Sequence, residues 1–197
     1  MRSPIALVPY LLLAAFVAGG YVWHLGDITA GLAPVETGEV TVGGAFTLTD
    51  QNGAIRHDTD YRGKYMLVFF GYTYCPDVCP TTLSILSAAL DKIAGKAERV
   101  VPIFISIDPE RDTPEAMKTY LSAFGPRFVG LTGSVADVTA AARAYHVYFQ
   151  KHLTPGGSYS IDHSSVIYLM GPDGRYVTNY SIEQGPDAIA TDLAKRL

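Results

Sequence analysis

The sequence predicts an α/β protein: a central β-sheet flanked by helices, with an N-terminal β-hairpin and one N-terminal transmembrane helix. Three observations predict it. Residues 5–23 are almost wholly apolar. Residues 64–70 and 100–107 form two further apolar runs, typical of strands that are buried on both faces of a sheet. Apolar residues at helical spacing follow each of these two runs, and strands that alternate with helices predict a sheet covered by helices.

The composition narrows the class of protein. The chain has 197 residues, enough for one domain and an appendage, and 48% of them are hydrophobic. The net charge is −4, and the 15 Lys and Arg residues are scattered along the chain. Because nucleic-acid binding requires a gathered basic patch, the sequence predicts no nucleic-acid partner.

The run over residues 5–23 is close to the roughly 20 residues that a membrane-spanning helix needs. Arg2 and the amino terminus carry positive charge before it, and the next Lys or Arg is Arg56. The positive-inside rule therefore predicts a cytoplasmic N-terminus, a single-pass anchor in a bacterial inner membrane, and a domain in the periplasm. A cleaved signal peptide is the alternative, since Ala18 and Gly20 resemble a cleavage site, but the run exceeds a typical signal core.

Three segments follow from this pattern. We expect the membrane anchor over residues 1–25, a linker over residues 26–42, and the folded domain over residues 43–197. The linker contains Gly, Pro and Thr with little periodicity.

The domain begins with a predicted hairpin, in which residues 46–49 alternate, Asn52-Gly53 supplies the turn and residues 54–57 return. The strand over 64–70 leads into a helix with Pro80 in its first turn and an end near Gly95. Its apolar positions recur at helical spacing: Leu83, Leu86, Leu90 and Ile93.

After the strand over 100–107, Thr113 is a predicted helix cap, with Pro114 at the first helical position. Its apolar residues are Met117, Leu121 and Phe124, and Gly125-Pro126 ends it. A short strand over 128–131 precedes a helix to about residue 144, where Ser134 and Asp137 predict a capping box.

The last part of the chain returns to strand patterns. Residues 145–150 alternate, and residues 154–158 predict a loop. Residues 165–170 and 175–180 predict a second hairpin, and a final helix follows from residue 184.

The only two cysteines, Cys75 and Cys79, lie on the turn between the strand over 64–70 and the next helix. Such a pair forms a disulfide, cycles between dithiol and disulfide, or binds a soft metal. In one regular helical turn their Cβ atoms would be about 5–6 Å apart, which exceeds the roughly 3.5–4.5 Å of a relaxed disulfide. Two thiolates on one ion lie about 4 Å apart, so the spacing favours a metal over a static bridge.

A two-thiolate metal site needs a further ligand, and His163 is the candidate. It precedes a predicted buried strand within the polar segment Asp162-His163-Ser164-Ser165, although a hydrogen-bonded structural histidine would fit there too. Two thiolates and an imidazole are soft ligands that suit Cu(I) best, with zinc as a rival. The other histidines are predicted to be interfacial, solvated or at element ends: His24, His57, His146 and His152.

Acidic residues surround these candidates. Asp77 and Asp162 would favour a bound cation and disfavour a very acidic thiol, but turn and cap roles explain them equally well. For the cluster Asp108, Glu110, Arg111 and Asp112, salt-bridge or capping roles are favoured over a direct role in chemistry.

Three ordered motifs carry a family resemblance: GYTYCPDVCP at residues 71–80, SIDPERDT at 106–113, and DHSS at 162–165 continuing through YLMGPDG at 168–174. Together they resemble the Sco/SenC family of membrane-tethered copper-binding proteins with a thioredoxin-like fold. The resemblance extends from about residue 43 to the C-terminus. The CxxC after Trp that marks thioredoxins is absent, as is the Thr three residues before the reactive Cys of peroxiredoxins.

The resemblance implies that Cys75, Cys79 and His163 are ligands of one copper ion, Cu(I) or alternatively Cu(II). It implies assembly of the binuclear CuA centre in subunit II of cytochrome c oxidase. The chain would deliver copper, or act as a thiol-disulfide reductase with Cys75 and Cys79 as its redox-active pair. Subunit II is the expected partner, with another periplasmic copper chaperone or thiol reductase as a second. A copper or redox sensor is a third possibility, for which the sequence offers no separate effector surface.

Overall fold

The computed structural model describes residues 20, 21, 23 and 41–197, and the structural statements below concern these residues. The chain divides into two units, residues 1–40 and residues 41–197. All but residues 20, 21 and 23 of the predicted membrane anchor, and nearly all of the predicted linker, lie outside the described residues. Among the residues that are described, no helix combines the length and the apolar character that crossing a membrane requires.

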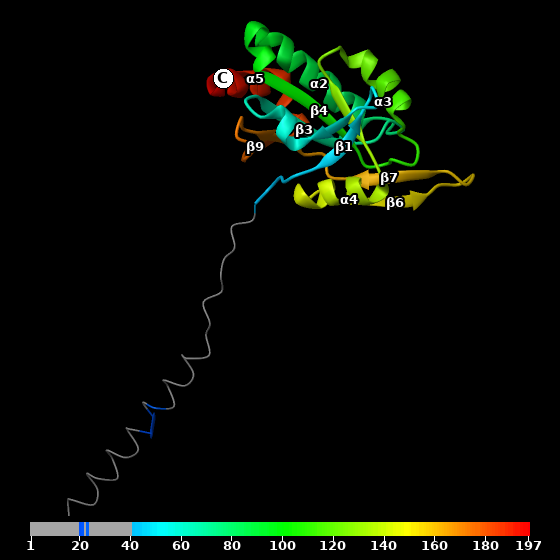
Figure 1. The fold of residues 1–197 in the computed structure, drawn as a ribbon, viewed down its shortest axis with the longest axis horizontal. Coiled ribbons are helices and arrows are strands. Elements are labelled where there is room, and N and C mark those ends of the chain that lie inside the picture. Colours follow the sequence, from blue (N-terminus) through cyan, green and yellow to red (C-terminus); the bar gives the residue numbers. More distant parts are fainter. Residues whose placement is uncertain (1–19, 22, 24–40) are drawn as a thin grey trace, which may run out of the picture. The chain divides into compact units, whose positions relative to one another are not determined.

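A seven-stranded mixed sheet forms the centre of the second unit (Figure 1), in the order β2-β1-β5-β4-β3-β8-β9. Strands β3, β4 and β5 run parallel, and the other pairs are antiparallel. The strands are β1 Thr47–Asp50, β2 Ile55–His57, β3 Tyr65–Gly71, β4 Val100–Ser106, β5 Val129–Thr132, β8 Ile167–Met170 and β9 Tyr176–Tyr180.

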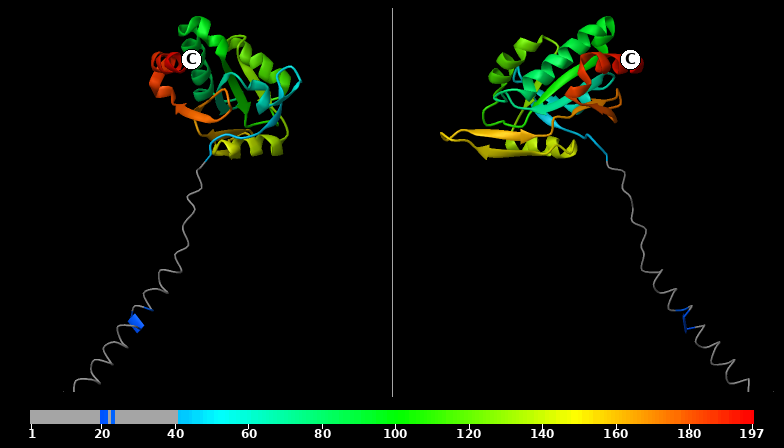
Figure 2. Two further views of the ribbon diagram at one scale, coloured as in Figure 1. Left: turned by 60° about the vertical axis from the view of Figure 1, so that its left-hand side comes forward. Right: turned by 180° about the vertical axis from the view of Figure 1, so that it is seen from behind.

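Helices cover both faces of this sheet, as Figures 1 and 2 show. The helices are α2 Val78–Lys92, α3 Pro114–Leu121, α4 Val135–Ala144 and α5 Gly185–Arg196. Right-handed crossovers from β3 to β4 and from β4 to β5 place α2 and α3 on one face. Helix α5 packs beside α2, and α4 lies on the opposite face. The predicted α/β arrangement of a sheet flanked by helices is confirmed.

A separate two-stranded hairpin lies on the α4 side, formed by β6 Phe149–Leu153 and β7 Tyr159–His163. Four short 3₁₀ helices complete the described unit: η2 Asp58–Tyr61, η3 Ala94–Arg99, η4 Ser122–Phe124 and η5 Ile182–Gln184.

The core is built on β3 and β4, the two strands that the apolar runs predict. Met66, Leu67, Val68, Phe69 and Phe70 are each at most 1% exposed, because side chains on both faces of β3 meet a covering layer. The parallel pairing of β3 with β4 brings the carboxyl ends of both strands to one edge, with Gly71 opposite Ser106. In sheets of this kind, functional residues gather beyond that edge.

Both predicted helix caps form. Thr113 Oγ1 accepts a hydrogen bond from the Ala116 N–H at 3.2 Å, and Ser134 Oγ accepts one from the Asp137 N–H at 3.1 Å. The Asp137 carboxylate, however, accepts from the Ser134 hydroxyl and not from a backbone N–H. Only one half of the predicted capping box is therefore present.

Two predicted boundaries are wrong for the same physical reason. Helix α2 ends at Lys92, before Gly95, because Ala94 has a φ of 45° and the chain continues as η3. The strand predicted from residue 145 begins only at Phe149, because His146 has a φ of 54°. A left-handed residue interrupts both a helix and a strand, and neither alanine nor histidine announces one in a sequence.

The β6–β7 hairpin changes the expected surroundings of the histidine. The predicted loop over 154–158 connects its two strands, but β7 was not predicted. The strand predicted from residue 165 starts at Ile167, so His163 ends β7 and does not open β8.

Candidate metal centre

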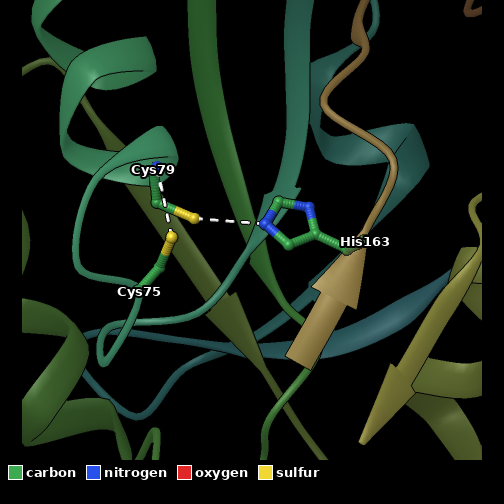
Figure 3. Close-up of side chains that lie close together, drawn as sticks. All are labelled: Cys75, Cys79 and His163. Atoms are coloured by element: carbon green, nitrogen blue, oxygen red, sulfur yellow. Dashed lines mark hydrogen bonds between the residues drawn. The ribbon is translucent and has the colours of Figure 1, made fainter. Parts of the chain in front are cut away.

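The structure brings the two cysteines and the candidate histidine together at the carboxyl edge of the sheet. Figure 3 shows Cys75 in the loop after β3, Cys79 in the first turn of α2, and His163 at the end of β7. Their potential ligand atoms all lie within 4.8 Å of one another. Cys79 is fully buried, whereas Cys75 and His163 are partly exposed, so the cluster is reachable from one side.

A buried aspartate holds the cysteine loop in place. Asp112 accepts hydrogen bonds from the Thr73 N–H at 3.1 Å, the Thr73 hydroxyl at 2.6 Å and the Ser106 hydroxyl at 2.7 Å. These bonds join the loop after β3 to the end of β4. Burial raises the pKa of Asp112, and the three donors oppose that shift. The sequence indicated a capping or salt-bridge role for this residue, and it serves as a loop anchor.

The two thiols are free and differ in their electrostatics. The pKa of Cys75 is lowered, chiefly by the neighbouring Cys79 thiol and further by His163, and the Cys79 N–H donates a hydrogen bond to the Cys75 sulfur at 3.4 Å. The pKa of Cys79 is raised by the same pairing and by burial. Cys75 is therefore the more acidic thiol of the pair.

For Asp77 and Asp162 the sequence left two roles open, a charge effect on the site and a local turn or cap role, and the structure gives both carboxylates local partners. The Asp162 side chain is 71% exposed and lies 3.1 Å from His152. Asp77 accepts a hydrogen bond from the Thr81 hydroxyl at 3.3 Å. Both carboxylates are outside the group of candidate ligand atoms, and the largest cause of the lowered pKa of Cys75 is the Cys79 thiol.

Contacts of both ring nitrogens fix the orientation of the His163 imidazole. The Ser164 carbonyl lies 3.1 Å from Nδ1 and can only accept, so Nδ1 carries the proton. Nε2 is then the unprotonated nitrogen, and it lies 3.5 Å from the Cys79 sulfur. The rings of Phe69 and Tyr72 contact the imidazole at centroid distances of 6.0 Å. The bond of a ligand histidine to a carbonyl through its other nitrogen is a common feature of metal sites.

The separations suit one soft ion. Sulfur and nitrogen ligands at about 2.3 Å and 2.0 Å in a trigonal arrangement would lie about 3.7 Å apart. The distance of 3.5 Å between Cys79 Sγ and His163 Nε2 is close to this value. Two thiolates and a neutral imidazole form a donor set that suits Cu(I), and zinc is the rival ion.

The other histidines that the structure describes lie elsewhere. His57 pairs with the Thr47 hydroxyl at 3.0 Å, His146 lies 3.2 Å from the Thr41 carbonyl, and His152 faces Asp162. His24 is outside the described residues. Among the described residues, the cluster with His163 is the one group of three that can hold a metal.

Sequence reasoning did not predict the contacts that two residues, Gly71 and Arg111, make beside the cluster. Gly71 lies so close to Cys79 that a Cβ at its position would be 2.7 Å from the sulfur. Arg111 lies over the rings of Tyr72, Tyr74 and Tyr159 at 5.8, 4.5 and 3.7 Å. A glycine directly after a buried strand was the available signal for the first, whereas the second depends on residues far apart in the sequence.

Comparison with known proteins identifies relatives of the whole domain. The SCO1/SenC family model matches residues 34–197. A solved structure of Bradyrhizobium japonicum ScoI with copper bound is 47% identical; the match covers 79% of this chain and 99% of that one, with a TM-score of 0.75. The human mitochondrial SCO1 homolog is 40% identical over 167 residues.

The mitochondrial SCO1 homolog 1 of Arabidopsis thaliana is 35% identical over 207 residues. The matches cover 99% of this chain and 62% of the Arabidopsis protein, and 81% of this chain and 54% of the human protein. The chain thus spans a little over half the length of these relatives. With a family model that matches most of its length, this chain belongs to the SCO1/SenC family.

Proposed function

We propose that the chain is a copper metallochaperone that binds one ion as Cu(I) through Cys75, Cys79 and His163. The observation that supports this proposal most directly is that the three potential ligand atoms lie within 4.8 Å of one another, beyond the carboxyl ends of β3 and β4. Copper is favoured over zinc because the donors are soft and because a relative at 47% identity has been solved with copper bound.

The destination that family membership suggests is the CuA centre of cytochrome c oxidase subunit II. Cys75 is partly exposed and Cys79 is buried, so an incoming cysteine would approach from the side of Cys75 and His163. The imidazole is the neutral ligand, and its replacement by a partner's thiolate would leave no unpaired charge behind. Copper would then pass by stepwise exchange of ligands between the two proteins.

The proposed setting is the periplasmic face of a bacterial inner membrane. Residues 1–25 would form a single-pass anchor with a cytoplasmic N-terminus, and residues 26–42 would connect it to the domain over 43–197. The apolar run over 5–23 and the absence of Lys or Arg between it and Arg56 support this topology. A membrane tether would keep the chaperone close to a membrane-embedded oxidase.

Thiol-disulfide reductase activity is a second candidate, favoured by the unequal pKa values of the cysteines. The Cys75 thiolate would attack a disulfide of subunit II and release one of its thiols. Cys79, after losing its proton, would then attack the Cys75 sulfur of the mixed disulfide. The second thiol of subunit II leaves reduced, and a Cys75–Cys79 disulfide remains.

One pair of reactions separates the two candidates. Copper-loaded protein is mixed with the reduced, copper-free CuA domain of subunit II, and the copper on each protein is measured after separation. In parallel, copper-free reduced protein is mixed with the disulfide form of that domain, and the free thiols on each protein are counted after separation. The chaperone proposal predicts copper transfer that H163A impairs, and it fails if no copper moves. The reductase candidate predicts that the disulfide of the domain is reduced as Cys75 and Cys79 are oxidised, also in H163A, and it fails if the disulfide persists.

A further inference from the structure

Arg111 lies between the two segments that carry the candidate ligands. Its guanidinium contacts the ring of Tyr74, the residue directly before Cys75, at 4.5 Å. On another side it contacts the ring of Tyr159, the first residue of β7, at 3.7 Å, and its Nη1 donates to the Tyr159 carbonyl at 3.2 Å. One side chain therefore links the cysteine loop to the strand that ends at His163.

Asp108 completes this arrangement. It pairs with Nε of Arg111, and its other oxygen accepts the Tyr159 hydroxyl at 2.7 Å. The Asp108 side chain is fully buried, so the ion pair is shielded from water. We call Tyr74, Asp108, Arg111 and Tyr159 the arginine clasp.

The guanidinium of Arg111 packs mainly against the faces of aromatic rings. Its Nη2 atom is buried and finds no hydrogen-bond partner in the described part of the chain. The Tyr72 ring adds a third face at 5.8 Å. A planar guanidinium stacks on such faces, and the compact ammonium of lysine does not reproduce that geometry. The contacts are therefore specific to arginine and are not a matter of charge alone.

Strand β7 connects the arginine clasp at Tyr159 to the candidate ligand His163. Alternate residues of a strand share one face, so Tyr159, Ile161 and His163 point to the same side. The clasp holds the Tyr159 side chain on that side, and the Ile161 backbone N–H, which points sideways from the strand, donates to the Tyr72 hydroxyl at 3.3 Å. The β6 strand opposite is mostly exposed and gives little packing. These contacts, together with the ion pair of Lys151 with Glu110, tie the hairpin (Figure 2) to the segments that follow β3 and β4.

We propose that Arg111 is a positioning residue that holds the His163 strand against the cysteine loop and so completes the three-ligand copper site. The inference rests on the proposed copper-binding function. Without the clasp, the two cysteines keep their places through Asp112, whereas His163 loses one of the contacts that set its distance from them. Mutation of a residue that orients a metal ligand typically lowers metal affinity by about 10–100-fold.

The test compares the purified full chain with its R111K variant. R111K keeps a positive charge beside Asp108 but loses the flat stacked group, so the fold should survive. We expect Cu(I) affinity, measured by competition with a chromogenic chelator, to fall about 10-fold. Copper-edge absorption should show two sulfur neighbours and a weakened nitrogen contribution. R127K is the matched control, because Arg127 pairs with Asp91 on the surface and contacts neither segment.

A double variant separates positioning from general destabilisation. If Arg111 acts through His163, R111K/H163A should bind copper about as tightly as H163A alone, since the effects of coupled residues do not add. Wild-type affinity in R111K, or a full additional loss in the double variant, overturns the inference. If R111K does not fold, Y74L removes an exposed ring of the clasp and is judged by the same two measurements. A wild-type chain that binds no copper would instead refute the proposed function.

Discussion

Gly71 is the last residue of β3 and lies next to the buried Cys79, so the variant G71A tests how tightly the site is packed. A Cβ there would stand 2.7 Å from Cys79 Sγ and 2.7 Å from Phe104 Cε2. Both side chains are fully buried, so neither can turn away into solvent. To reach the 3.4 Å at which ordinary van der Waals contact begins, the gap must open by about 0.7 Å.

Two measurements follow from that displacement. Overpacking of this kind costs about 1–3 kcal/mol, and each kcal/mol lowers Tm by about 2–4 °C in a domain of this size. The sulfur of Cys79 shifts relative to His163 Nε2, so we also expect Cu(I) affinity to fall about 10-fold, as for other disturbed metal sites. Thermal melts of the copper-free protein and chelator competition of the loaded protein report the two effects separately.

G95A is the control for this prediction. A Cβ at Gly95 has no neighbour within 4 Å, and its φ is not in the left-handed region. The variant should therefore melt and bind copper like the wild type. The reasoning is refuted if G71A retains both wild-type Tm and wild-type copper affinity, because the two buried side chains would then have moved at no cost.

Three further predictions concern the cysteine pair, the β7 strand and the last helix. C79A removes the thiol that lowers the pKa of Cys75, so the pH midpoint for alkylation of Cys75 by iodoacetamide should rise; an unchanged midpoint contradicts this effect of Cys79 on Cys75. Y72F removes the hydroxyl that accepts the buried Ile161 N–H, and chemical denaturation should show a loss of about 1–3 kcal/mol, while the ring that contacts His163 remains; equal stability would remove that bond from the account. The hydrogen bond from Arg196 lowers the pKa of Asp192 below 3.8, so ionised Asp192 stabilises the fold at neutral pH, and this stabilisation disappears as pH falls through the lowered pKa. D192N should therefore flatten the dependence of the free energy of unfolding on pH between about pH 2 and 5. A pH profile parallel to that of the wild type would rule this out.

The sequence was most informative where one physical requirement dominates. Strands β3 and β4 are buried on both faces, and such strands need apolar residues at nearly every position. The caps at Thr113 and Ser134 depend only on neighbours within three residues, so local pattern suffices to predict them.

The β6–β7 hairpin could not be predicted in the same way. Four of the five β6 residues are exposed, so no buried face imposes an alternating pattern on them. The order of strands in the sheet also depends on contacts between distant segments, such as the antiparallel pairing of β8 with β3. Without β7, the sequence indicated His163 as a candidate but gave no geometry for it.

The arginine clasp, too, could not be predicted from local sequence pattern. Asp108 and Arg111 are close in sequence; salt-bridge or capping roles were favoured for their cluster, and a salt bridge between these two residues forms. The contact of Arg111 with Tyr159 joins residues that are 48 positions apart, and periodicity carries no information about such a pair. Its relation to the candidate ligands becomes visible only when β7 is placed beside the cysteine loop.

The most direct test of the copper site is its stoichiometry and ligand set. Reduced wild-type protein and H163A are loaded with Cu(I), washed free of excess metal, and examined by elemental analysis and copper-edge X-ray absorption. We predict one copper ion per wild-type chain with two sulfur neighbours and one nitrogen neighbour, and a weaker site with two sulfur neighbours alone in H163A. An identical copper content, affinity and nitrogen contribution in the two proteins would contradict a site built from Cys75, Cys79 and His163.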